Sequence, residues 1–124
     1  MKEVVFAIHD EQIAEHEGAE GLRDLCGLET ALMRPVNAFH YGESDLCVLA
    51  GLYAEGICRN PPFVDGNKRT AFLTSVVFLA INGLRLTASE ADTVIIVVKL
   101  AAGEIDAAGY AYWLRTNHEV KTLG

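Results

Sequence analysis

A short stretch near the middle of the chain holds side chains suited to phosphate chemistry. Asp65 offers a carboxylate, which is the kind of ligand that Mg²⁺ prefers. Lys68 and Arg69 offer cationic groups for phosphate oxygens, and Asn67 offers an amide donor. Gly66 lets the backbone approach a ligand closely. Together these residues are the parts of a phosphoryl- or nucleotidyl-transfer site.

The position of this stretch supports the same interpretation, because an apolar segment that predicts a helix over 67–82 follows it directly. The first N–H groups of a helix have no internal partner and carry partial positive charge, so a helix start binds phosphate readily. Ordinary structural roles stay open: Asp65 could be a helix N-cap, and Asp-Gly-Asn is a common turn sequence. Two cations in a first helical turn are unfavourable for the helix dipole, however, and this favours an anionic ligand nearby.

Apolar residues recur at helical spacing along most of the chain, which predicts an all-α fold. We expect a compact single-domain bundle of about six helices over residues 1–124, around a buried central helix near 67–82. The Val94–Val98 run is equally compatible with a buried strand, but the absence of turn signals on either side favours a helix. The expected segments are helices at 6–16, 28–33 and 44–59, an exposed connection at 36–43, the central helix, a fifth helix opened by a Thr87–Glu90 capping box and ended by Gly103, and a last helix capped by Asp106.

Composition narrows the choice of partners and compartment. The chain of 124 residues has a net charge of −7 and a pI near 5.0, so direct binding to nucleic acid is not expected. Its three cysteines form no Cys-x-x-Cys pair, which predicts free thiols in a reducing compartment. We see no signal peptide and no apolar run long enough to span a bilayer, so a cytoplasmic location without a membrane partner is expected.

Residues 59–71 read Arg-Asn-Pro-Pro-Phe-Val-Asp-Gly-Asn-Lys-Arg-Thr-Ala and resemble the signature of the Doc (death-on-curing) branch of the Fic family. That signature reads His-x-Phe-x-Asp-(Gly or Ala)-Asn-Lys-Arg. Every specified position is matched except the histidine, which falls on Pro61. Further Doc-like segments occur in the expected order along the chain, at 8–10 and 27–35 before this motif and at 82–83 after it.

The resemblance implies the compact helical Fic fold and a toxin encoded beside an antitoxin. Doc-type toxins carry a lysine at the position of Lys68. They are similar to kinases, and they use ATP and Mg²⁺ to phosphorylate a threonine of elongation factor Tu. It also implies catalytic and metal-binding roles for Asp65, a catalytic role for Arg69, and nucleotide binding by Gly66, Asn67, Lys68 and Arg69. The expected antitoxin is Phd-like and binds by a C-terminal helix in a groove. AMP transfer is the alternative activity. It is disfavoured by Lys68, because Fic enzymes that transfer AMP have glycine at this position.

Pro61 departs from the family pattern at the residue that would remove a proton from the acceptor hydroxyl. Proline has no titratable group, and loss of a general base costs about 10² to 10⁴ in rate. Three explanations are open: an inactivating change in a toxin, a natural pseudoenzyme that still binds nucleotide or antitoxin, and slow chemistry with a weak or water-borne base. His40, in the expected 36–43 connection, is the candidate for a replacement base.

Overall fold

The computed structural model describes residues 1–121, and these form an all-α fold with one small sheet. The number of helices and the helical class agree with the sequence prediction. The elements are α1 (Lys2–His16), α2 (Leu25–His40), α3 (Leu46–Arg59), α4 (Asn67–Ile81), β1 (Leu84–Leu86), α5 (Glu90–Ala102), α6 (Ala107–Thr116) and β2 (His118–Val120). None of the described helices is long and apolar enough to cross a membrane.

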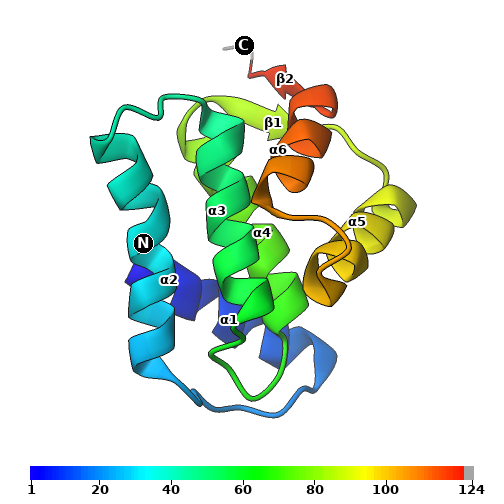
Figure 1. The fold of residues 1–124 in the computed structure, drawn as a ribbon. Coiled ribbons are helices and arrows are strands. Elements are labelled where there is room, and N and C mark those ends of the chain that lie inside the picture. Colours follow the sequence, from blue (N-terminus) through cyan, green and yellow to red (C-terminus); the bar gives the residue numbers. More distant parts are fainter. Residues whose placement is uncertain (122–124) are drawn as a thin grey trace.

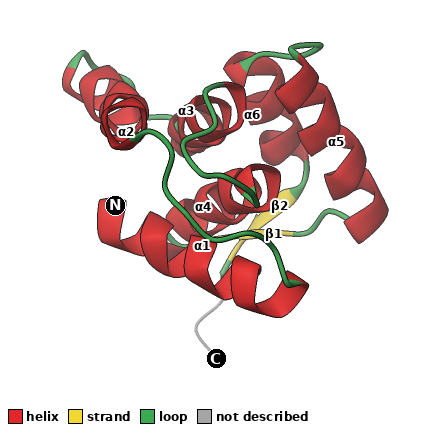
Figure 2. Cartoon of the chain, turned by 90° about the horizontal axis from the view of Figure 1, so that it is seen from below, coloured by secondary structure: helices red, strands yellow, loops and turns green. Residues whose placement is uncertain are grey.

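The helices lie in two layers, which are seen end-on in Figure 2. One layer contains α2, α3 and α6, and the other contains α1, α4 and the two strands, with α5 closing one side (Figures 1 and 2). As predicted, α4 lies inside the fold, where it packs on α1, α3, α5 and β1. It shares this central place with α3, which packs on α2, α4, α5 and α6.

Two glycines let α3 approach its neighbours in the same layer. A Cβ at Gly51 would lie 2.7 Å from the carbonyl oxygen of Ala107 at the start of α6. A Cβ at Gly56 would lie 3.0 Å from the Cβ of Ala31 in α2. Because the groups in contact are backbone atoms or short side chains, α3 packs closely between α2 and α6. Its C-terminal end is thereby fixed next to the loop that contains Asp65.

The prediction for α2 was wrong, because this helix continues through Pro35 to His40 instead of ending near Arg34. Proline inside a helix removes one hydrogen bond and costs about 3 kcal/mol. Here Leu28, Ala31, Leu32 and Pro35 itself form a buried face, and its packing outweighs that cost. The expected exposed connection at 36–43 is therefore mostly helix.

Predictions for the second half were closer. Val94–Val98 is helical as expected, α5 ends at Gly103 with φ +78°, and Asp106 caps α6 through a 2.9 Å bond from the Gly109 N–H. The start of α5 differs, because Ser89, and not Thr87, accepts the N–H of Asp92 as the cap. The antiparallel pair β1–β2 was not predicted, since each strand has only three residues.

Glu55 joins three helices, and its loss should destabilise the fold. Its carboxylate accepts hydrogen bonds from Arg34 of α2 and from the N–H of Ala107 in α6, each at 2.6 Å, and its side chain is 14% exposed. Glu55→Ala leaves both donors without this acceptor, so the free energy of unfolding should fall by about 1.5–3 kcal/mol in urea titrations. Glu29→Ala, at an exposed position in α2, is the matched control and should change it by less than about 0.5 kcal/mol. Equal effects of the two substitutions would contradict this role for Glu55.

Candidate functional site

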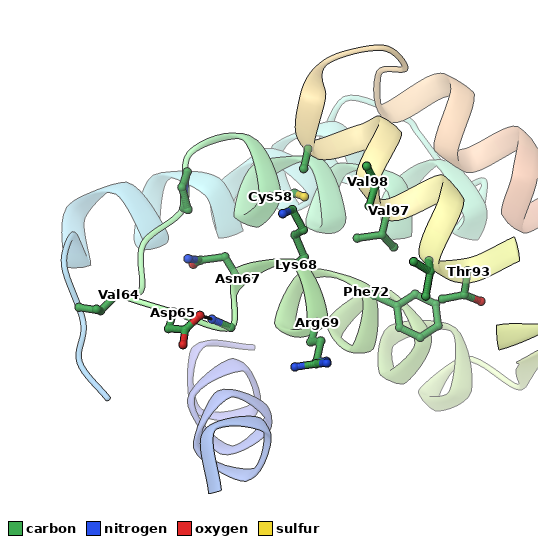
Figure 3. A pocket seen from close by; sticks show the side chains of 14 residues that line it. Cys58, Val64, Asp65, Asn67, Lys68, Arg69, Phe72, Thr93, Val97 and Val98 are labelled. Atoms are coloured by element: carbon green, nitrogen blue, oxygen red, sulfur yellow. Dashed lines mark hydrogen bonds between the residues drawn. The ribbon is translucent and has the colours of Figure 1, made fainter. Parts of the chain in front are cut away.

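A cavity of about 530 Å³ lies at the end of the fold where α3 passes into α4 (Figure 3). Its polar end is formed by the predicted site residues, namely Pro61, Asp65, Gly66, Asn67, Lys68 and Arg69. Its other wall is apolar and consists mainly of Phe72 from α4 and Val94, Val97 and Val98 from α5. The structure therefore brings the predicted residues of the 61–69 loop to one cavity, and it adds an apolar wall beside them.

Asn67 holds the loop in shape by binding the backbone of Phe63 twice. Its side-chain oxygen accepts the Phe63 N–H at 3.0 Å, and its side-chain nitrogen donates to the Phe63 carbonyl at 2.9 Å. We call this pair of bonds the Asn67 clamp. The sequence prediction gave the Asn67 amide to a ligand, but in the structure both of its polar atoms are engaged with the loop. Asn67 thus fixes the path of the chain into α4.

The loop is also anchored from inside the protein and along its outer edge. Phe63 is 1% exposed, so its ring anchors the loop in the core. On the outside, the segment between α1 and α2 runs beside the loop. Hydrogen bonds of 2.7 and 3.0 Å connect the N–H groups of Arg23 and Asp24 to the Pro62 carbonyl, and the Arg23 side chain donates to the Pro61 carbonyl at 2.7 Å.

Asp65 is exposed and oriented by backbone donors. Its two carboxylate oxygens accept the N–H groups of Ala19 at 3.1 Å and of Gly66 at 2.8 Å. These two hydrogen bonds, with a contribution from the positive charge of Arg69, hold the pKa of the Asp65 carboxyl below its usual range. The carboxylate is therefore charged at neutral pH and keeps further lone pairs for a cation.

The first turn of α4 presents its donors and cations to the cavity. Gly66 precedes the helix with φ +75°, and no side chain caps the helix start. Lys68 and Arg69 are exposed, and neither forms an ion pair within residues 1–121. Figure 3 shows Lys68 reaching towards Cys58 at the end of α3, whereas Arg69 extends to the opposite side of α4. The two cations therefore flank the helix start and do not converge on one point.

Within residues 1–121, no histidine lines the cavity beside Pro61, where the family resemblance places the base. His40 lies at the C-terminal end of α2, next to the connection to α3 and at the opposite end of the fold from the loop (Figure 1). It does not line the cavity, so the prediction of His40 as a replacement base was wrong. The prediction placed His40 in a connection, whereas the structure places it in the last turn of α2. His118 is engaged elsewhere, with Nδ1 2.9 Å from the Leu114 carbonyl.

Sequence reasoning missed two contributions to the site. The apolar Val94–Val98 run was predicted as a helix, but no role in the site was assigned to it, and its half-exposed Val94 and Val98 form part of the cavity wall. Cys58 is a free thiol, as predicted for the cysteines, but it is buried and lines the cavity. Burial raises the pKa of the Cys58 thiol, and the nearby Lys68 only partly offsets this, so the thiol remains protonated at neutral pH.

The Asn67 clamp gives a direct stability prediction. Asn67→Ala removes partners from a backbone N–H and a carbonyl that are partly buried, so the free energy of unfolding should fall by about 1–3 kcal/mol. The neighbouring Lys68→Ala, at an exposed position, should change it by less than about 0.5 kcal/mol. Chemical denaturation of both variants checks this, and a harmless Asn67→Ala would show that the clamp does not hold the loop.

Comparisons with known proteins point to one family. A sequence profile of the Fic/DOC family matches residues 2–79. The chain is 32% identical over 114 residues to Protein kinase doc of Escherichia phage P1, a match covering 91% of this chain and 90% of the relative. It is 40% identical over 70 residues to Toxin Doc of Mycolicibacterium smegmatis, covering 54% of this chain and 53% of that protein. The family profile covers more than half of the chain, and the first of these relatives matches along most of its length, so the chain belongs to the Fic/DOC family.

Proposed function

We propose that this chain is a Doc-type toxin component that binds ATP with Mg²⁺ in the cavity at the start of α4, and that Pro61 deprives it of the base for phosphate transfer. The observation that carries the proposal is that Asp65, Gly66, Lys68 and Arg69 line one cavity while the base position holds proline. The relatives named as a protein kinase and a toxin support the family activity.

The residues of the cavity fit a magnesium–nucleotide complex. The ionised carboxylate of Asp65 would hold Mg²⁺, which commonly takes one or two protein carboxylates and fills its other positions with phosphate and water. The bound metal would neutralise charge on the phosphates. The N–H groups of the first α4 turn, together with Lys68 and Arg69, would bind phosphate oxygens. The apolar α5 wall offers a surface for the nucleotide base.

Lys68 supports phosphate transfer over AMP transfer. Its side chain occupies part of the cavity next to Cys58 (Figure 3), in space that glycine would leave open. A nucleotide that places its γ-phosphate towards the acceptor would react by attack of a protein hydroxyl on the γ-phosphorus, with departure of ADP. The hydroxyl proton needs an acceptor, and the Pro61 side chain offers none. The proposed acceptor is a threonine of elongation factor Tu, and the proposed partner is a Phd-like antitoxin that binds by its C-terminal helix.

A non-catalytic role is the second candidate, because Pro61 removes the base while the rest of the site is present. Incubation with ATP labelled at the γ- or α-phosphate and with elongation factor Tu separates the candidates. Transfer of the γ-label indicates a kinase, transfer of the α-label indicates an AMP-transferase, and absence of both indicates a binding protein.

Nucleotide binding is testable without turnover. ATP with Mg²⁺ in large excess over its Kd should raise the Tm by about 3 °C or more, because it binds the folded state. Arg69→Ala should weaken the shift, since it removes a cation from the cavity. Arg85→Ala is a matched control, because Arg85 lies on β1, pairs with Glu119 and does not line the cavity. No shift in the unmutated chain at millimolar ATP would remove the nucleotide-site proposal.

Restoring the base should restore toxicity. Pro61→His adds an imidazole with a pKa near about 6.5, which suits proton removal at neutral pH. Induction of this variant should arrest growth, co-expression of the cognate antitoxin should relieve the arrest, and the unmutated chain should cause none. Adding Asp65→Ala to Pro61→His should abolish the arrest. Equal growth of the unmutated chain and Pro61→His at matched expression would instead favour the non-catalytic role.

A further inference from the structure

His9 lies against the loop that forms the polar end of the cavity, although it comes from the first helix. The side chain is buried, at 4% exposure, on the face of α1 that packs on α4. Its ring stacks on Phe63, with centroids 3.7 Å apart and planes inclined by 9°. Its Nε2 lies 2.8 Å from the Asp65 carbonyl oxygen. A carbonyl can only accept, so Nε2 carries the hydrogen and donates it.

We propose that His9 is a positioning residue that sets the orientation of Asp65 for binding a magnesium–nucleotide complex. The inference rests on the function proposed above and goes beyond it, because His9 does not line the cavity and has no role in that account. It would act through Asp65 and would not touch the ligand.

Helix α1 and the turn after it hold Asp65 at both ends. His9 binds the Asp65 carbonyl, and the N–H of Ala19 binds one carboxylate oxygen at 3.1 Å. The second carboxylate oxygen is bound by Gly66, which follows in the loop itself. A residue fixed at its carbonyl and at its carboxylate has little freedom to rotate, so α1 determines the direction in which Asp65 offers its remaining lone pairs.

Close packing gives this arrangement little slack. A Cβ at Gly66 would lie 3.2 Å from Cδ1 of Ile13 and at an ordinary contact distance, 3.7 Å, from Cδ2 of His9, so side chains of α1 line this part of the loop. A Cβ at Gly18 would lie 2.9 Å from the Asp65 carboxylate, so the turn that supplies the Ala19 N–H has no room for a side chain there. A side chain that only filled space could pack on Phe63 in the same way, but it would not bind the Asp65 carbonyl.

Two substitutions separate the hydrogen bond from the stacking. His9→Phe keeps an aromatic ring on Phe63 and loses the donor, whereas His9→Gln keeps an N–H donor and loses the ring. Each variant is titrated with ATP by calorimetry, once with Mg²⁺ and once with EDTA. The ratio of the two Kd values reports how much the metal tightens nucleotide binding. A purely structural role for His9 would change both Kd values together and leave this ratio unchanged.

Mg²⁺ tightens ATP binding by a certain factor in the unmutated chain, and we expect His9→Phe to reduce this factor about tenfold or more. Losing a residue that orients a metal ligand usually has an effect of this size. ATP binding in EDTA should stay within about twofold of the unmutated chain, and His9→Gln should keep most of the tightening. An unchanged ratio in His9→Phe, or equal loss of both affinities, would overturn the inference. A failure of the proposed function can be told apart from a failure of this inference, because in the first case the unmutated chain itself would not bind ATP.

A measurement on the unmutated protein covers the case in which the variants do not fold. Nitrogen-15 NMR of the imidazole at neutral pH should show the hydrogen of His9 on Nε2, protected from exchange with solvent. Finding the neutral ring with its hydrogen on Nδ1 would overturn the inference, because the bond to the Asp65 carbonyl would then be absent.

Discussion

The two hydrogen bonds between Asn67 and the backbone of Phe63 are the constraint on which the candidate site depends. They close the loop directly before α4, so that the loop and the first turn of the helix form one unit. With Phe63 buried beneath it, the unit can move only if the core moves. Asp65 and Gly66 are therefore presented to the cavity at fixed places, and the helix start behind them keeps its N–H groups available.

The rest of the fold serves to hold that unit from several sides. Helix α3 delivers the chain to the loop and is fixed by close contacts at Gly51 and Gly56. Helix α1 supports the loop from below through His9, and the segment after α1 follows its outer edge through Arg23. Helix α5 supplies the apolar wall that converts a loop surface into a cavity. None of these contacts uses the Pro61 side chain, which explains how the loop can keep its shape with proline at position 61.

Local sequence signals predicted much of the architecture, and long-range contacts explain what they missed. Gly103 and Asp106 marked the end of α5 and the start of α6 because caps act within a few residues. Pro35 gave a wrong end for α2, since tertiary packing outweighed a local preference. The loop motif identified the residues at the cavity. It did not show that the Asn67 amide is engaged with Phe63, and no pattern pairs His9 with a carbonyl 56 residues away.

The loop before α4 should keep its shape whatever residue stands at position 61. The most direct measurement is calorimetric titration of the unmutated chain and of Pro61→His with ATP and Mg²⁺ under identical conditions. Because none of the contacts that hold the loop uses the side chain at position 61, the two Kd values should agree within about threefold, which is less than 1 kcal/mol. Binding by Pro61→His together with no detectable binding by the unmutated chain would show instead that the residue at position 61 helps to form the binding site.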